Sequence, residues 1–363
     1  MVPSTHSTLS ASEPVYLPFD LSGVCFLFLS RYEEAVGNAG DIHGRFPTEE
    51  TVVSKLGLLE QPFVDVAIQW LEAAIARLWS QLPKAHRRGS TVVTCDLDIL
   101  FQPQSLSFAK ASRKVVGDLL KRGSSKDAVE TLRLFMDSNR GRLDRDPNQL
   151  TINWIMDVNE TAGNVVDFNI IPDSKHATFD PVYAIDDPNT KSLLRHIHNR
   201  CHRIGIHPSY TSFNDEDQFS RETDALAAVL RSLELPSVAG ERQHYFCWDA
   251  LRSPGIWHRQ HLREDSTLGY ADACGFRCGT CRPFRLYDLE SRTSTAVVEQ
   301  SLVFMETVVL ESSAGRVDTR GILYNALPLR STCARMEGDF VILWHNSSLQ
   351  LPFDREAYEA LIT

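Results

Sequence analysis

The sequence lacks the features that mark fibrous, disordered or repetitive proteins. It has 363 residues, of which 43% are apolar and 23% are charged, close to the average for soluble globular domains. No internal repeat or low-complexity tract interrupts it. Disorder, collagen-like repeats and coiled coil are therefore excluded as the main architecture, and the chain is long enough to bury a substantial core.

An excess of positive charge is also missing. Lys and Arg number 37 against 47 Asp and Glu, which gives a formal net charge of −10. A chain of this sign is repelled by nucleic acid phosphates and by anionic lipid headgroups. We therefore expect neither to be the main partner.

The sequence contains neither a long apolar run nor a secretory leader. The apolar run Val24–Leu29 is too short to span a bilayer, and the N-terminal residues have no basic segment followed by an apolar one. Eight cysteines are scattered along the chain rather than grouped as in small disulfide-rich domains. These absences favour a cytoplasmic protein with reduced thiols.

Two domains are expected from the pattern of apolar and polar segments. Apolar side chains recur at helical spacing over residues 62–81, and a polar, basic connector follows at 84–90. We place the domain boundary in this connector. Residues 1–88 are predicted to be a smaller accessory α/β domain, and residues 89–363 the main domain.

Strands and helices alternate in the main domain. Strands are predicted at 91–98, 164–171, 203–206, 243–248, 302–310 and 340–344, and helices at 108–140, 187–203 and 215–234. This alternation is typical of an α/β fold with a mostly parallel sheet or barrel.

Acidic and imidazole side chains follow three of the predicted strands. Asp96 and Asp98 follow Val-Val-Thr-Cys, His207 follows Arg-Ile-Gly-Ile, and His345 follows Phe-Val-Ile-Leu-Trp. Functional groups gather at the carboxyl ends of parallel strands. A divalent metal held by one carboxylate and imidazoles, with the other carboxylate deprotonating water, is one interpretation; two exposed loop acids without a metal is the other.

The same residues resemble a known family. The segments Thr94–Asp98, Gly205–Tyr210 and Leu343–Asn346 are similar, in this order, to the motifs of polysaccharide deacetylases (carbohydrate esterase family 4, the NodB-homology domain). Further segments resemble a bacterial branch of that family with an extra N-terminal domain: Phe28–Glu34, His43–Phe46, Arg242–Tyr245, Asp265–Asp272 and Gly275–Thr280.

The resemblance implies a distorted (β/α) barrel with fewer than eight strands, and metal-dependent removal of N-acetyl groups from a sugar or polysaccharide precursor. The metal of such families is usually zinc. Carried over by motif, the roles are base for Asp96, acid for His345, positioning of Asp96 for Arg242, metal ligation for Asp98 and His207, and substrate contact for Tyr210, His244 and Arg277.

One departure from the family pattern leaves two functions open. The family's second motif supplies two histidines four residues apart, whereas Thr211 occupies the second position here. His244, His345 or a water could replace the missing ligand. Alternatively the metal is lost, and a silent barrel binds glycan or scaffolds a biosynthetic complex.

Three further sequence features are weaker indications of function. Cys278 and Cys281 form a CxxC pair that could bind zinc or exchange electrons, but no second pair exists, and packed thiols are the commoner explanation. His198 and His202 are spaced for one helix face without the glutamate of a zinc protease. Tyr245 could stack on a sugar ring, although core packing is more common for such residues.

Overall fold

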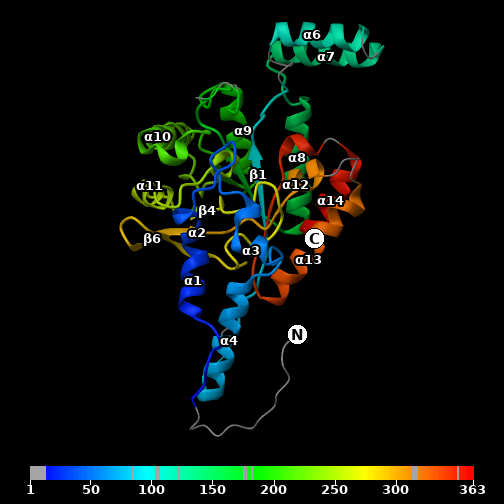
Figure 1. The fold of residues 1–363 in the computed structure, drawn as a ribbon. Helices are drawn as coiled ribbons and strands as arrows, with labels where there is room; N and C mark the ends of the chain where they lie inside the picture. The colour runs from blue at the N-terminus through cyan, green and yellow to red at the C-terminus, as the bar shows by residue number, and fades with distance from the viewer. Residues whose placement is uncertain are drawn as a thin grey trace.

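The computed structural model describes residues 14–83, 86–102, 107–120, 123–174, 176, 178–180, 183–312, 318–349 and 351–363. Its centre is a five-stranded parallel sheet in the order β3-β2-β1-β8-β7, and a three-stranded sheet, β4-β6-β5, lies beside it (Figure 1). The strands of the first sheet are β1 (Thr91–Leu97), β2 (Val166–Ile170), β3 (Arg203–Ile206), β7 (Phe304–Met305) and β8 (Phe340–Leu343). Those of the second are β4 (Glu264–Asp265), β5 (Phe284–Asp288) and β6 (Thr293–Glu299).

Glu241 joins the two sheets into one curved surface. It pairs in parallel with Ile206 at the end of β3 and with Asp265 in β4. Among the described residues no strand pairing connects β7 to β5 on the opposite side. The fold is therefore a mostly parallel, strongly curved α/β sheet, as the sequence predicts, and a closed barrel is not formed by these pairings.

Alternation along β1 separates the core from the site. Val93, Cys95 and Leu97 are fully buried in the main apolar core, whereas Thr94 and Asp96 point to the other face of the sheet. Apolar residues of α8 (Pro147–Ala162) belong to the same core, and this helix starts at an Asp146 cap with proline in its first turn and ends at Gly163 in the left-handed region (φ 78°).

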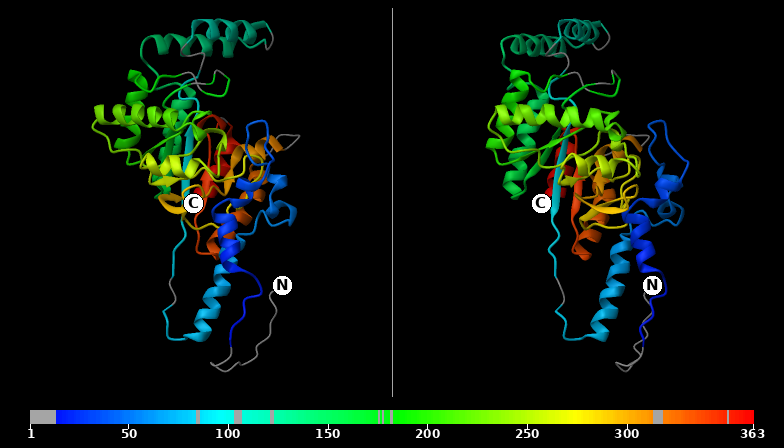
Figure 2. Two further views of the ribbon diagram at one scale, coloured as in Figure 1. Left: turned by 60° about the vertical axis from the view of Figure 1, so that its left-hand side comes forward. Right: turned by 90° about the vertical axis from the view of Figure 1, so that its left-hand side faces the viewer.

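Six further helices of the main domain cover the outside of the sheet (Figures 1 and 2). They are α9 (Pro188–Asn199), α10 (Glu216–Ser232), α11 (Ser253–Arg259), α12 (Glu306–Ser312), α13 (Thr319–Arg335) and α14 (Pro352–Ile362). The helices predicted near 187–203 and 215–234 are confirmed as α9 and α10. Of the helices in the described residues, none has the length and apolar character to cross a membrane.

Two predicted strands are wrong or shortened. Residues 243–248 contain a 3-10 turn, His244–Phe246, because Tyr245 (φ 59°) and Phe246 (φ 54°) have left-handed backbones that a strand cannot accommodate. Within 302–310 only Phe304–Met305 is strand, and α12 begins directly after it at Glu306.

A helical hairpin projects from the body after β1 (Figures 1 and 2). It consists of α6 (Phe108–Leu120) and α7 (Ser125–Asn139), with Ser124 capping α7, and it confirms the helical prediction for 108–140. Several of its apolar side chains are exposed, including Phe108 and Leu120.

The N-terminal region is helical, which corrects the expectation of an α/β accessory domain. It contains α1 (Leu21–Leu29), α2 (Tyr32–Val36), α3 (Val52–Lys55) and α4 (Phe63–Leu78), and its described residues form no strand. The apolar residues near Val24 lie in α1, which Asp20 caps by accepting from Gly23 N–H. The predicted connector lies partly outside the described residues, at 84–85.

The N-terminal helices pack on the loop Gly275–Cys281 of the main domain. Glu34 accepts hydrogen bonds from Arg277 at 2.9 Å and from Arg31 at 2.7 Å, and Asp65 of α4 accepts from the Cys281 backbone N–H at 2.9 Å. Although burial alone would raise the pKa of Glu34, Arg277 and Arg31 hold it below its usual value. Cys278 and Cys281 are buried in this interface, which agrees with packed thiols.

Candidate metal centre and its pocket

A cavity of about 530 Å³ lies at the carboxyl ends of β1, β3 and β8. Five of the acidic and imidazole side chains singled out in the sequence line it: Asp96, Asp98, His207, His244 and His345. The parallel strands bring these distant segments together at one edge of the sheet, where functional groups collect in α/β folds.

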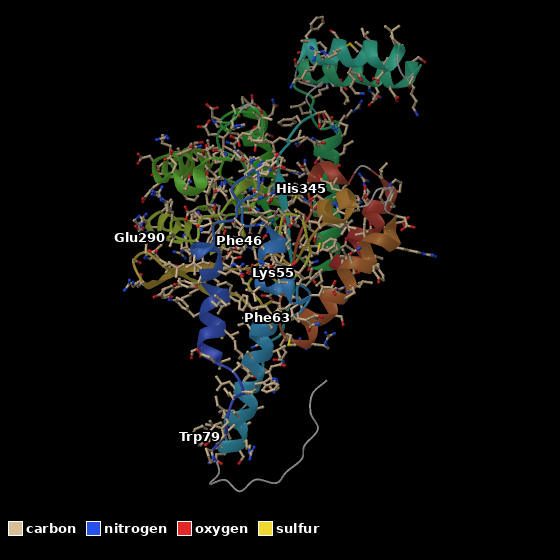
Figure 3. The ribbon with its side chains drawn as sticks, viewed as in Figure 1. Phe46, Lys55, Phe63, Trp79, Glu290 and His345 are labelled. Atoms are coloured by element: carbon tan, nitrogen blue, oxygen red, sulfur yellow. The ribbon has the colours of Figure 1, made fainter. Side chains whose placement is uncertain are left out.

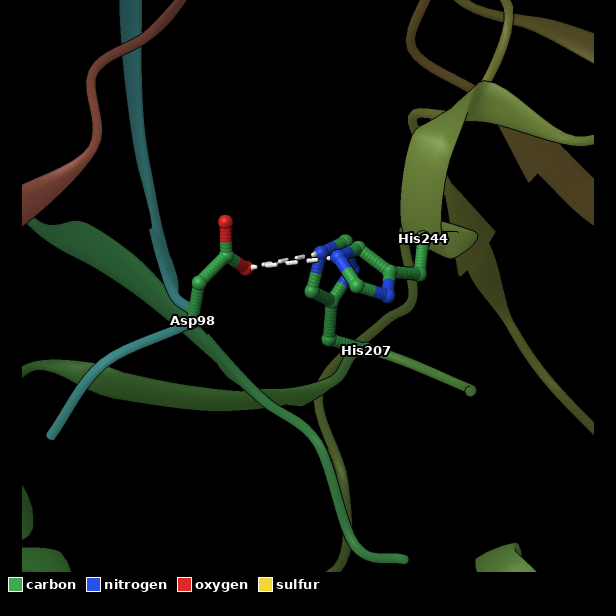
Figure 4. A group of neighbouring side chains, drawn as sticks. All are labelled: Asp98, His207 and His244. Carbon is green, nitrogen blue, oxygen red and sulfur yellow. Dashed lines mark ion pairs between the residues drawn. The ribbon is translucent and has the colours of Figure 1, made fainter. Parts of the chain in front are cut away.

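Asp98, His207 and His244 form a group that could hold a metal ion. Their potential ligand atoms all lie within 4.8 Å of one another (Figure 4). Asp98 Oδ1 is 3.4 Å from His207 Nε2 and 3.8 Å from His244 Nε2. One carboxylate and two imidazoles are a donor set suited to zinc and similar divalent cations.

Both histidines are oriented through their other ring nitrogen. His207 Nδ1 is bonded to the backbone carbonyl of Arg242, and His244 Nδ1 lies 3.3 Å from Asp180 Oδ1. Outer partners of this kind fix the tautomer of metal-binding histidines and leave Nε2 as the ligand atom. Asp98 Oδ1, between the two Nε2 atoms, is buried and accepts no hydrogen bond of ordinary geometry from the described residues. The donor set and this oxygen fit a bound cation.

The electrostatics of the group favour positive charge. Burial would raise the pKa of Asp98, but the His207 ring, whose Nε2 lies 3.4 Å from Oδ1, and the charges of His345 and His244 hold it well below its usual range. Burial would lower the pKa of His207, but Asp96 and Asp98 raise it overall. Asp98 is thus ionised, and the cavity around it attracts cations.

Asp96 lies beside this group, held through one oxygen. Asn169 Nδ2 donates to Asp96 Oδ1 at 2.7 Å, and Arg242 Nη1 is 3.4 Å from the same atom. Arg242 is fully buried and also donates to Thr94 Oγ1 at 2.5 Å. The other oxygen, Oδ2, lies 3.7 Å from His207 Nε2 and is placed to accept a proton next to a bound cation.

His345 lies on the other side of Asp98. Its Nε2 is 3.8 Å from Asp98 Oδ2, and its Nδ1 is 2.8 Å from Oε1 of the fully buried Glu306. Burial would lower the pKa of His345, but Glu306, and then Asp98, raise it to about 10. The ring is therefore protonated at neutral pH, and Nε2–H can donate a proton in the cavity.

The structure places three further residues of the sequence analysis as follows. Thr211 donates to Gln218 Oε1 at 3.0 Å and is not part of the metal group; His244, named both as a substrate contact and as a possible replacement ligand, joins Asp98 and His207 there. Arg277 is paired with Glu34 and lines a neighbouring cavity of about 230 Å³ instead of this one. Tyr210 does not line the cavity of the metal group, and its hydroxyl is 2.9 Å from His43 Nδ1.

Four residues of the site are absent from the sequence predictions. Asp180 and Glu306 orient His244 and His345, and His43 and Arg45 bring the N-terminal region into the cavity lining. Glu306 directly follows β7, so the rule that found Asp98 and His207 would have found it had the strand end been placed correctly. Nothing in the sequence pattern indicates that His43 reaches a site on the main domain.

Comparison with known proteins gives limited likenesses. Residues 2–80 match the model of a family of unknown function, DUF7033. No curated protein matches the chain. A Mycobacterium smegmatis protein assigned to the polysaccharide deacetylases has a similar structure, with a TM-score of 0.48, 13% identity, and coverage of 77% of this chain and 85% of that one. The catalytic domain of a peptidoglycan N-acetylglucosamine deacetylase from Eubacterium rectale follows at a TM-score of 0.34 and 10% identity, covering 58% and 76%. Likenesses this distant assign no activity to the chain.

Proposed function

We propose that the chain is a metal-dependent hydrolase that removes N-acetyl groups from a sugar or polysaccharide precursor. The observation that carries the proposal is the arrangement around Asp98. Its Oδ1 faces His207 and His244, its Oδ2 faces His345, and Asp96 lies beside His207. A metal group with a carboxylate and a protonated imidazole next to it has the parts that amide hydrolysis requires.

Asp98, His207 and His244 would hold the cation, for which we propose zinc. When bound, it supplies positive charge that polarises an acetamide carbonyl and makes water more acidic. The remaining chemistry belongs to the chain. Asp96 Oδ2 accepts the proton of the attacking water, and His345 Nε2 donates a proton to the nitrogen as the C–N bond breaks. The products are acetate and the free amine of the sugar.

Arg242 and Glu306 position the two proton-transfer groups. Arg242, with Asn169, holds Asp96 Oδ1, so that Oδ2 remains directed at the metal group. Glu306 holds the His345 ring through Nδ1 and through the backbone N–H. In this proposal residues 89–363 form the catalytic domain and residues 1–88 an accessory domain. The substrate partner is an N-acetylated carbohydrate.

The silent-barrel alternative depends on the missing histidine at Thr211. His244 offers an imidazole beside Asp98 and His207, and this supports the hydrolase proposal over that alternative. Elemental analysis of the purified chain, together with acetate release from N-acetylglucosamine oligomers, tests the proposal. We expect one equivalent of divalent metal and released acetate. A chain that binds no divalent metal and releases no acetate from any such oligomer would overturn it.

A further inference from the structure

The segment Asp41–Arg45 of the N-terminal region is a rigid turn. Asp41 Oδ1 accepts from the backbone N–H groups of His43 (2.8 Å) and Arg45 (2.9 Å), and Asp41 Oδ2 accepts from Arg45 Nε at 2.8 Å. Gly44 adopts φ 75°, a conformation that glycine takes without strain. Hydrogen bonds between a side chain and the backbone of its own turn hold the turn in one conformation, so His43 occupies a defined position.

This turn is fixed against the residues that follow the metal ligand His244. Arg45 Nη1 donates to the Tyr245 backbone carbonyl at 3.0 Å. The His43 ring packs on the rings of Tyr245 (4.9 Å between centroids) and Phe179 (5.3 Å). Tyr245 and Phe179 line the cavity of the metal group, and His43 and Arg45 line it with them.

His43 has one ring nitrogen available for a ligand. Its Nδ1 is taken by the Tyr210 hydroxyl at 2.9 Å, and no described residue bonds Nε2. Tyr210 in turn does not line the cavity, so its contact with His43 orients the ring. A half-buried imidazole held through one nitrogen, in a wall with aromatic neighbours, is the kind of polar group that fixes a ligand's orientation in a pocket.

We propose that the turn Asp41–Arg45 is a wall of the sugar-binding pocket and that His43 Nε2 is a specificity-determining contact to an oxygen of the bound saccharide. This inference rests on the proposed function and deepens it. It gives the N-terminal region, which matches only a family of unknown function, a direct part in substrate recognition. The ligand is a neutral N-acetylated saccharide whose hydroxyl or carbonyl oxygen meets His43.

A second cavity extends the pocket along the N-terminal region. It measures about 230 Å³ and shares Arg45, Phe246 and Ala271 with the cavity of the metal group. Thr48 from the N-terminal side and Tyr270 from the main domain also line it. A saccharide that fills both cavities passes Arg45, and we therefore expect oligomers of two or more units to be better substrates than a single N-acetylated sugar.

Substitutions of His43 separate recognition from structural support. His43→Asn retains an amide near the position of Nδ1, and so the bond to Tyr210, but has no group where Nε2 lies. His43→Gln places an amide near the position of Nε2 and has no group where Nδ1 lies. We expect His43→Asn to raise KM for N-acetylglucosamine oligomers about three- to tenfold, the effect of one neutral hydrogen bond, with kcat and melting temperature nearly unchanged. His43→Gln should recover part of the loss. His196→Asn is the matched control, because this exposed histidine bonds Asn153 on the outside of the fold.

The outcomes distinguish the pocket wall from the proposed function. If His43→Asn has the wild-type KM, His43 does not contact the saccharide. If both variants raise KM equally and also lower the melting temperature, His43 only supports the fold. If the wild type releases no acetate, dissociation constants for the N-acetylglucosamine tetramer are compared instead. Weaker binding by His43→Asn then supports the wall although the hydrolase proposal fails, and absence of binding by the wild type overturns both.

Discussion

Glu306 Oε1 lies 2.8 Å from His345 Nδ1 and also accepts the backbone N–H of His345 at 3.0 Å. The carboxylate is fully buried at the start of α12, so its charge acts on the imidazole without screening by water. This contact turns His345 Nε2 towards Asp98 and stabilises the protonated ring.

Replacement of this carboxylate should separate proton donation from metal binding. We expect Glu306→Gln to lower kcat by about 10- to 100-fold, because His345 loses the partner that orients and charges it, while metal content stays at the wild-type level. Acetate release and elemental analysis measure the two effects. Glu290→Gln is the control, since Glu290 lies on the β5–β6 side of the molecule, far from His345 (Figure 3). Unchanged kcat in Glu306→Gln would contradict the role of His345 as acid.

The identity of the third metal ligand can be tested with two variants. His244→Ala should weaken zinc binding by at least about tenfold, because it removes one of three neighbouring donors. Thr211→Ala should leave zinc affinity unchanged, because the Thr211 hydroxyl bonds Gln218 instead. Zinc titration against a chromogenic chelator measures both. The opposite ranking of the two variants would place the ligand at Thr211 after all.

The two aspartates should have different effects when altered. Asp98→Ala should abolish metal binding, because its oxygen lies between His207 and His244. Asp96→Asn should retain the metal and lose turnover, because the amide cannot accept a proton from water while Asn169 and Arg242 still surround it. Metal content and acetate release are compared on the same preparations. Residual turnover near wild type in Asp96→Asn would remove it as the base.

Stability should depend on pH through a row of buried acids. Glu241, Asp265 and Glu299 are neighbours across adjacent strand segments and are at most 2% exposed. Burial raises all three pKa values, and the charge of Asp265 adds to the shift in Glu241 and Glu299. Because the folded state favours the protonated forms of Glu241 and Glu299, their contribution to stability is complete below the unfolded pKa of about 4 and is lost as pH rises towards the folded values, at about 1.4 kcal/mol per pKa unit.

The matched variant is Glu241→Gln, which replaces one acid by a neutral group of similar shape. Its stability relative to wild type should increase steadily from pH 5 to pH 8, as judged from denaturant unfolding at each pH. A constant difference between the two proteins over this range would show that Glu241 is ionised in the folded state.

The sequence predicts the central sheet because local pattern and burial agree there. β1, β2, β3 and β8 are short apolar strands that end in polar residues, so the same reasoning that locates the strands also locates Asp96, Asp98, His207 and His345. Helices with clear caps, such as α10 between Asp215 and Leu233, are also predicted near their true ends.

The sequence fails where position depends on tertiary contacts. His244 is in a turn with left-handed neighbours, and no periodicity indicates that it lies within 4.8 Å of Asp98 and His207. His43 is more than 160 positions from Tyr210, its hydrogen-bond partner, so only the packing of the N-terminal helices brings the two together. Arg277 is paired with the buried carboxylate of Glu34, and no local pattern around Arg277 indicates this partner.

Because Arg277 of the main domain and Glu34 of the N-terminal region form a bidentate contact, we expect the two residues to change together in evolution. Each charge is almost fully buried and is neutralised by a residue more than 240 positions away. A homologue without the first 80 residues would have a guanidinium at position 277 that lacks its carboxylate partner. Homologues without the N-terminal helices should therefore carry an uncharged residue there, and a survey of natural variants would find Glu34 and Arg277 gained or lost as a unit.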